Sequence, residues 1–179
     1  MSTLSPISHI GRISGTEQIL WNLRAHPELW NLNAERTSKE DSPHREVDDI
    51  WVRYASNSSD AAGPHDSVWY PDSDALDVRG AVLDVFTRLG GTKLGGVLIT
   101  RIPPGKQVYP HVDLGWHARH YEKVAVQIAS APGQRFRFDH NELEPCPGDV
   151  YTFDNSRRHW VENPTPYERV TLIICMRRV

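Results

Sequence analysis

The sequence predicts a mainly β protein, a double-stranded β-helix or jelly roll with flanking N-terminal helices. Two observations predict this fold. After Gly96, short runs rich in β-branched and aromatic residues alternate with Gly and Pro turns up to the C-terminus. Many short strands with regular turns are typical of sandwiches and barrels. The helical patterns are confined to the first half of the chain, which indicates helices that flank a separate β-rich core.

Length and composition indicate one ordinary globular domain. The 179 residues suffice for a single domain, which we divide into a helical and loop flanking region, 1–95, and a β-rich core, 96–179, that carries the functional residues. The net charge is −3, with acidic and basic residues interspersed, so nucleic acid is not an expected partner. Cys146 and Cys175 show no CxxC spacing, so neither a zinc knuckle nor a disulfide framework is indicated.

The sequence shows no pattern for membrane insertion or secretion. The N-terminus lacks a basic start followed by an apolar core, and no apolar run approaches the roughly 20 residues that span a bilayer. We therefore expect a soluble, cytoplasmic protein with no membrane partner.

Two helices are predicted in the first half. One begins at a Thr16 cap and ends near Pro27, with apolar residues on one face. The other covers 75–89 and ends at Gly90, and its apolar stripe predicts packing on a sheet without any chemical role.

Between these helices the sequence predicts little regular structure. Residues 31–49 indicate an irregular connection or lid, and their role stays open. Residues 46–54 have the pattern of a strand, and residues 55–74 that of a long loop. Trp51 and Trp69 could form one wall of a pocket, although ordinary core or loop anchors are the alternative.

The second half is predicted to consist of short strands. They cover residues 97–102, 107–113, 123–129, 134–138, 149–153, 159–162 and 169–176.

A candidate metal site begins with His111 and Asp113. The two residues are separated by one position in a predicted strand, so their side chains point the same way. His159, from a later strand, would complete a two-histidine, one-carboxylate set that favours iron(II) and leaves positions open for O2 and a bidentate cosubstrate. The alternative is a chance HxD in a chain with nine His. His117 or His120 could replace His111, but neither has a carboxylate two residues away.

A candidate anion site follows at Arg169 and Thr171. Arg169 enters an apolar strand, where a cation is costly to bury without an anionic partner. Thr171 shares its face, so a guanidinium and a hydroxyl could together hold a carboxylate. The alternatives are that Arg169 pairs with Glu168 or Glu162, or reaches solvent.

Together these residues resemble the 2-oxoglutarate and iron(II) dependent oxygenases. Their pattern is HxD or HxE, a distal His, and an Arg about ten residues later with Ser or Thr at plus two. Residues 148–156, Gly-Asp-Val-Tyr-Thr-Phe-Asp-Asn-Ser, are similar to the run before the distal His in the aspartyl/asparaginyl β-hydroxylase-like group. The resemblance covers residues 96–177. Some members of that group bind iron without a carboxylate, so Asp113 rests on the wider pattern.

The resemblance implies an enzyme, a dioxygenase that hydroxylates a C–H bond of an amino acid or amino-acid side chain. His111, Asp113 and His159 would bind Fe(II), and Arg169 with Thr171 would hold the distal carboxylate of 2-oxoglutarate. Oxidative decarboxylation to succinate would generate an iron(IV)-oxo intermediate. The expected partners are O2 and a small-molecule or peptide substrate. The resemblance does not predict the oligomeric state.

Further candidates are expected around these residues. Lys123 could help to hold 2-oxoglutarate, with a solvated lysine at a strand start as the alternative. Residues 114–121 follow the metal ligands as a loop that could cover the substrate. Substrate contacts are expected from this loop and from the N-terminal half, at Trp116, His117, Arg119 and Arg53.

Two other functions fit the same fold. Gly105-x5-His111 and His159-x3-Asn163 match parts of the two cupin motifs, so the predicted fold is also cupin-like. One alternative is therefore a cupin-like metal enzyme, an isomerase or a dioxygenase that needs no 2-oxoglutarate. The other is a noncatalytic barrel that binds a small anion.

Overall fold

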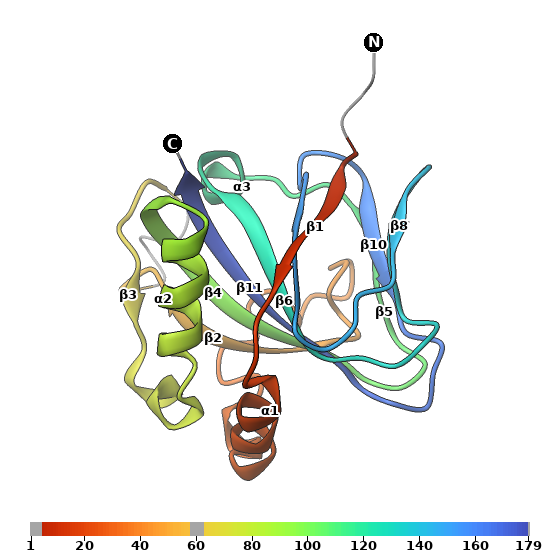
Figure 1. The fold of residues 1–179 in the computed structure, drawn as a ribbon, viewed down its shortest axis with the longest axis horizontal. Coiled ribbons are helices and arrows are strands. Elements are labelled where there is room, and N and C mark those ends of the chain that lie inside the picture. The colour runs from red at the N-terminus through yellow and green to blue at the C-terminus, as the bar shows by residue number, and fades with distance from the viewer. Residues whose placement is uncertain (1–4, 58–62, 179) are drawn as a thin grey trace.

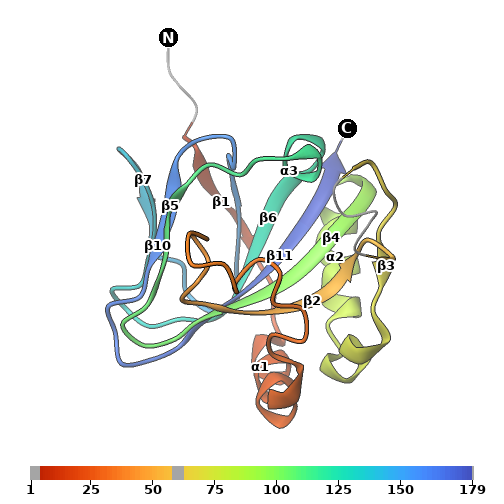
Figure 2. The same ribbon diagram turned by 180° about the vertical axis from the view of Figure 1, so that it is seen from behind.

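Two antiparallel sheets face each other in a computed structural model that describes residues 5–57 and 63–178 (Figures 1 and 2). In the described residues, the larger sheet has seven strands, in the order β1 (Ile7–Arg12), β9 (Asp149–Phe153), β6 (Glu122–Ala129), β11 (Arg169–Arg178), β4 (Gly91–Ile102), β2 (Asp48–Tyr54) and β3 (Val68–Trp69). The smaller sheet has four, in the order β5 (Gln107–His111), β10 (His159–Glu162), β7 (Arg135–Phe138) and β8 (Glu142–Leu143).

This architecture confirms the predicted jelly roll. From β4 to β11 the chain crosses repeatedly between the two sheets, so segments far apart in sequence become neighbours. The predicted strands 149–153 and 159–162 have the bounds of β9 and β10. The strand predicted at 97–102 is longer, because β4 already begins at Gly91 and pairs with the end of β11.

The helices are shorter than predicted. They are α1 (Thr16–Ala25), the 3-10 turns η1 (Pro27–Leu29) and η3 (Pro71–Leu76), α2 (Arg79–Arg88) and α3 (Trp116–His120). Thr16 is the first helical residue behind Gly15, not the cap. The helix predicted at 75–89 begins only at Arg79, because Asp77 takes a left-handed conformation with φ 51° that ends η3.

Strand β1 was not predicted. Its six residues, ISHIGR, lack a clear alternation of apolar and polar residues, yet they pair with β9 at one edge of the larger sheet. The first 95 residues therefore contribute strands as well as helices to the structure.

Two apolar clusters lie on opposite faces of the larger sheet. One packs β4, β6 and β11 against α1 and α2, and the other lies between the two sheets. Strand β6 illustrates the division: Val124, Val126 and Ile128 belong to the helix side, while Ala125 belongs to the cluster between the sheets. The alternation along β6 therefore places Lys123 on the inner face.

Residues 31–47 cross the space between the sheets as an irregular segment, seen in orange in Figure 2. The segment is attached to β5, because Tyr109 N–H donates to the carbonyl of Pro43 at 2.8 Å. It is also attached to β2, because Asn31 Nδ2 donates to Asp48 at 2.7 Å. Part of the predicted loop 55–74, residues 58–62, lies outside the described residues.

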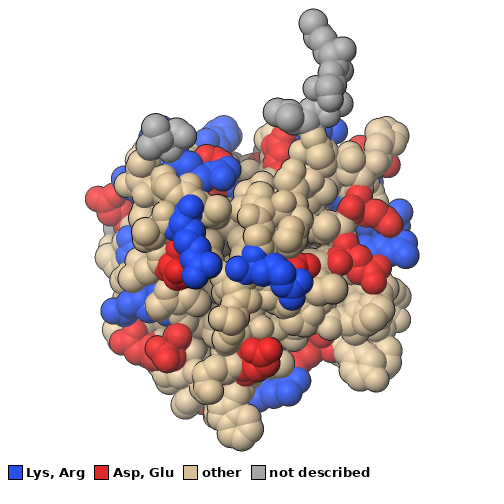
Figure 3. All heavy atoms as spheres, viewed as in Figure 1, with Lys and Arg blue, Asp and Glu red and all other residues tan. Residues whose placement is uncertain are grey.

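The surface seen in Figure 3 carries acidic and basic side chains interspersed among other residues. In the part of the chain that the structure describes, no helix has the length and apolar character needed to cross a membrane.

Gly148 supports a close approach of three strands. Its N–H donates to Gln127 O at 2.8 Å, and its carbonyl accepts from Ile13 N–H at 2.9 Å. The residue has φ 89°, and a Cβ there would lie 2.7 Å from the backbone oxygen of Ile13. The Pro147-Gly148-Asp149 turn is therefore a position where only glycine fits without strain.

We predict that Gly148→Ala lowers the free energy of unfolding by about 2 kcal/mol or more, because it combines a left-handed backbone with a clash against main chain. Urea unfolding would measure the change. Gly80→Ala is the matched control, since Gly80 lies in α2 with no atom within 4 Å of the added Cβ, and it should be neutral or stabilising. Equal stability of the two variants would contradict the prediction.

Candidate metal centre

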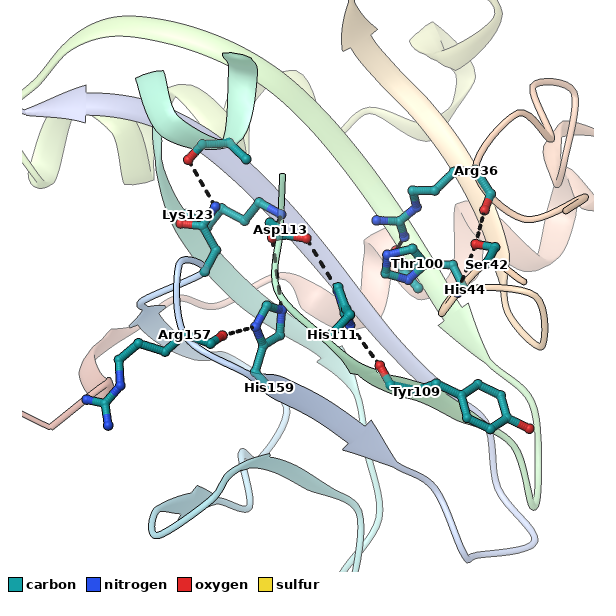
Figure 4. A network of polar contacts seen from close by, with 12 residues as sticks. Arg36, Ser42, His44, Thr100, Tyr109, His111, Asp113, Lys123, Arg157 and His159 are labelled. Carbon is teal, nitrogen blue, oxygen red and sulfur yellow. Dashed lines mark hydrogen bonds and ion pairs between the residues drawn. The ribbon is translucent and has the colours of Figure 1, made fainter. Parts of the chain in front are cut away.

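Two histidines face each other across the smaller sheet. His111 at the end of β5 and His159 at the start of β10 are direct Cα partners, and their ring centroids lie 4.4 Å apart. Each Nδ1 contacts a backbone carbonyl two residues earlier, at 2.7 Å from Tyr109 O and 2.8 Å from Arg157 O (Figure 4). In the tautomer that carries its proton on Nδ1, each ring donates to this carbonyl and presents its Nε2 lone pair to a metal.

Asp113 completes the set from outside the strand. The sequence analysis placed it in a strand with His111, but β5 ends at His111 and Asp113 lies in the following loop. The loop is held because Asp113 N–H donates to Asn155 O at 3.0 Å. Its carboxylate oxygens lie 3.3 Å from His111 Nε2 and 4.0 Å from His159 Nε2. The three predicted ligands therefore converge, although for a different reason from the one expected.

Charges around Asp113 keep the donor set ready for a cation. Burial alone would raise the pKa of Asp113, but Lys123, His111 and His159 together outweigh it and hold that pKa well below its usual range. The ammonium of Lys123 contacts Asp113 Oδ2 directly. Burial lowers the pKa of His159 to about 4, so its imidazole is neutral at neutral pH and its lone pair is available.

His44, which the sequence analysis missed, lies beside these residues. Ligand atoms of His44, His111 and Asp113 all lie within 4.8 Å of one another, and the rings of His44 and His111 are 4.7 Å apart. Burial, followed by the charge of Arg36, lowers the pKa of His44, so the ring is neutral. Its Nδ1 is buried without a partner in the described residues. No backbone carbonyl orients His44 as one orients His159, which favours His159 as the third ligand.

Arg169 forms the floor of the site. Its side chain is buried, with the residue only 1 % exposed, and its Nε has no hydrogen-bond partner in the described residues. Nη2 donates to the hydroxyl of Tyr151 at 3.3 Å, and Nη1 donates to the carbonyl of Gln134 at 3.5 Å. These are neutral partners. Burial lowers the pKa of Arg169, but a guanidinium stays protonated in a protein.

The carboxylates that were alternative partners of Arg169 are occupied elsewhere. Glu168 pairs with Arg24 at 3.0 Å, and Glu162 pairs with Arg137 at 3.2 Å. Arg169 therefore has no ion-pair partner among residues 5–57 and 63–178. A buried cation of this kind is expected to bind an anion that is not part of the chain.

Hydroxyl groups accompany the arginine. Thr171 lies on the same face of β11, and its Oγ1 donates to Gln127 Oε1 at 3.3 Å. Tyr151 donates to the same oxygen at 3.4 Å. Burial raises the pKa of Tyr151, which therefore keeps its proton and stays a donor. The sequence analysis missed Tyr151, although the alternation of β9 places it on the inner face.

Most of these groups line one pocket. Its polar lining residues are Arg36, His44, Thr100, His111, Asp113, Lys123, Tyr151, His159, Arg169 and Thr171. The rest of the wall is apolar, with Phe136 and Phe153 among its residues. Metal candidates and anion candidates therefore line a single, partly open pocket.

The predicted substrate residues lie in different surroundings. Residues 114–121 contain the helix α3, so the predicted loop is partly wrong. His117 lines a second pocket next to the first, where its Nε2 accepts from Gly96 N–H at 3.1 Å. Arg53 instead donates to Gly95 O at 3.1 Å, and Trp116 stacks on His120 at 4.8 Å. Arg119 is exposed.

Solved structures with the same fold include three oxygenases. A prolyl hydroxylase from Trichoplax adhaerens, in complex with a hypoxia inducible factor peptide fragment, has a TM-score of 0.61, 13% identity, and coverage of 97% of this chain and 84% of that one. The viral collagen prolyl hydroxylase of Paramecium Bursaria Chlorella virus-1, in a 2OG complex, has a TM-score of 0.58 and 12% identity, with coverage of 98% of this chain and 98% of that one. A 2OG-Fe(II) oxygenase family oxidoreductase from Burkholderia pseudomallei has a TM-score of 0.53 and 16% identity, with coverage of 74% of this chain and 67% of that one. No curated protein matches the sequence.

At these identities the solved structures establish the fold alone. The family model of the aspartyl/asparaginyl β-hydroxylases matches residues 78–179, which is more than half of the chain and includes every metal and anion candidate described above except His44 and Arg36. The chain therefore belongs to the aspartyl/asparaginyl β-hydroxylase family and is an enzyme of the hydroxylase class.

Proposed function

We propose that the protein is an iron(II) and 2-oxoglutarate dependent dioxygenase that hydroxylates a C–H bond of an amino acid or amino-acid side chain. The observation that carries the proposal is the pairing of two features in one cavity. A two-histidine, one-carboxylate set lines the same pocket as Arg169, a buried cation with no ion-pair partner in the described residues. A dicarboxylate that chelates a metal at one end and meets a cation at the other satisfies both.

The donor set fits Fe(II). Two neutral imidazoles and one carboxylate on one side of a site are the ligands of non-haem iron oxygenases, and they leave other positions open. His111, Asp113 and His159 would hold the ion. Iron(II) with 2-oxoglutarate supplies the oxidation, in which one oxygen atom of O2 enters succinate and the other becomes the substrate hydroxyl.

The chain supplies binding and the exclusion of water. The Arg169 fork and the hydroxyls of Thr171 and Tyr151 would hold the distal carboxylate of 2-oxoglutarate, a charge-assisted arrangement in a low-dielectric interior. Phe136 and Phe153 line the same cavity and keep its wall apolar. These contacts orient the cosubstrate and protect a reactive centre from solvent.

The alternatives explain less of the site. A cupin-like metal enzyme without 2-oxoglutarate accounts for the histidines but leaves Arg169 buried without an anion. A noncatalytic anion-binding barrel accounts for Arg169 but not for two imidazoles whose Nδ1 atoms are both fixed by backbone carbonyls. The dioxygenase explains both features.

We predict that the purified protein converts 2-oxoglutarate slowly to succinate with iron(II) and ascorbate, and that His111→Ala, Asp113→Ala and His159→Ala each abolish this turnover. Each change removes one of three ligands. Succinate formation and the weak visible absorption of the iron chelate measure the effect. Exposed His140 provides the control variant His140→Ala, which should behave as wild type.

Iron binding by two variants distinguishes the ligand set that contains His159 from the one that contains His44 in its place. His159→Ala should lose stoichiometric iron, while His44→Ala should still bind one iron per chain, because His44 is not oriented as a ligand. The opposite result would replace His159 with His44 in the assignment.

We predict that Arg169→Gln raises the KM for 2-oxoglutarate about thirtyfold or more, because the distal carboxylate loses its buried cationic partner. Steady-state kinetics at saturating iron measure the change. Arg24→Gln removes an exposed arginine that pairs with Glu168, and its KM should stay unchanged. An unchanged KM in Arg169→Gln would show that the arginine binds something else.

Lys123 has two candidate roles. It lines the cavity, as expected for a residue that contacts 2-oxoglutarate, but its ammonium already contacts Asp113. We assign it to positioning that carboxylate. Lys123→Met should then weaken iron binding about tenfold, in the range expected for the loss of a group that supports a metal ligand, with little change in the KM for 2-oxoglutarate. A raised KM with unchanged iron affinity would assign Lys123 to the cosubstrate.

A further inference from the structure

The second pocket adjoins the metal centre. It shares Arg36, His44, Asp113 and Lys123 with the first cavity and extends toward the side of α3 and β2. A molecule in this pocket would therefore lie beside Asp113 while 2-oxoglutarate occupies the cavity toward Arg169. Its position is that of a substrate site.

Two residues that line this pocket carry buried nitrogen atoms without a partner in the described residues. His44, only 9 % exposed, has a buried Nδ1 without a partner, and the indole Nε1 of Trp51 is also buried and unpaired in the described residues. Both residues line the pocket. An indole nitrogen can only donate, so a buried and unpaired Trp51 N–H requires an acceptor from a ligand or solvent.

Arg36 adds a third donor. Its Nε and Nη2 bind the fully buried Asp49 at 2.8 and 3.0 Å, and Nη2 also reaches Thr100 at 3.1 Å. This pair holds the guanidinium of a residue that lines both pockets, and within residues 5–57 and 63–178 no hydrogen bond of Nη1 is found, so that Nη1 could donate to a ligand. Figure 4 shows Arg36 and His44 approaching the site from the side opposite His159.

The charges of the loaded site also call for an anion. Arg36 and Asp49 cancel each other. Iron(II) brings two positive charges, and Lys123 and Arg169 bring one each, against one negative charge from Asp113 and two from 2-oxoglutarate. One positive charge remains in the pocket, where burial makes an unbalanced charge costly.

We propose that the Arg36, His44 and Trp51 subsite binds a free carboxylate, so that the substrate is a small carboxylic acid of net negative charge, such as an acidic amino acid or a simple carboxylate, rather than an internal residue of a protein. The inference rests on the proposed function. Three donors from β2 and from the segment 31–47 would contact the carboxylate oxygens. The carbon skeleton would extend along the apolar lining of Leu98 and Ile173.

The first experiment compares acids with their amides. The probes are the twenty free amino acids and simple mono- and dicarboxylic acids, each tested beside its primary amide, together with end-blocked peptides. Succinate formation and a product heavier by one oxygen atom are measured. At least one acid should stimulate turnover, and its amide should be about tenfold or more weaker, because a neutral group loses charge-assisted hydrogen bonds.

The outcomes separate this inference from the proposed function. Stimulation by blocked peptides or amides at the level of the acids, or by no acid at all, overturns the carboxylate subsite while succinate formation without substrate still supports the dioxygenase. Absence of any iron-dependent succinate formation overturns the proposed function itself.

A binding measurement tests the residues. In the inactive protein loaded with zinc and 2-oxoglutarate, calorimetry with the most active acid should give about tenfold weaker binding for Trp51→Phe, which keeps an aromatic side chain and removes the indole N–H together with the five-membered ring. His44→Phe should weaken binding similarly, and His44→Asn, which retains a donor near the position of Nδ1, should restore most of it. Arg36 is not substituted, because its loss would leave Asp49 buried and unpaired.

Trp21→Phe is the matched control, since Trp21 on α1 is 70 % exposed and lies outside both pockets. It should bind the acid as wild type does. Wild-type affinity for the acid in Trp51→Phe and His44→Phe would overturn the assignment of these residues.

Discussion

The antiparallel pairing of β5 with β10 is the constraint on which the site depends. It places His111 directly opposite His159, and each ring is then fixed by a backbone carbonyl of its own strand or loop. The loop that leads into β10 also accepts a hydrogen bond from the backbone of Asp113, so one stretch of chain positions all three groups. A shift of one residue in this register would turn one histidine to the other face of the sheet.

The larger sheet contributes a buried cation and two hydroxyl groups. Strands β9 and β11 bring Tyr151, Arg169 and Thr171 to the inner face, where apolar side chains from the smaller sheet surround them. Burial of a cation without a counter-ion opposes folding, and hydrogen bonds to neutral groups offset only part of that cost. In the proposed function, these groups would form a preorganised anion site, the arrangement that favours tight binding of a carboxylate.

The two pockets differ in the share of their lining that comes from regular and from irregular structure. Paired strands carry His111, His159, Arg169 and Thr171, so the positions of these residues follow from hydrogen-bond register, while Asp113 lies in a loop. The segment 31–47, together with β2, supplies Arg36, His44 and Trp51 on the other side. Under the proposed substrate subsite, a change of sequence in this segment would alter substrate choice without disturbing the barrel.

The sequence by itself determined most strands of the core, because alternation with period two is a local property, so the jelly roll could be predicted. The candidate metal and anion residues came from the spacing of His111, His159 and Arg169 and its resemblance to a known family, and the tertiary structure brings them to one pocket. The partner of Arg169 could not be predicted, because Glu168 and Glu162 both lie near it in sequence, and only the tertiary structure shows that both are occupied. The tertiary structure also decided the positions of Arg36 and His44, which lie in a segment without periodicity. Their positions follow from packing between distant strands, and no local pattern encodes that packing.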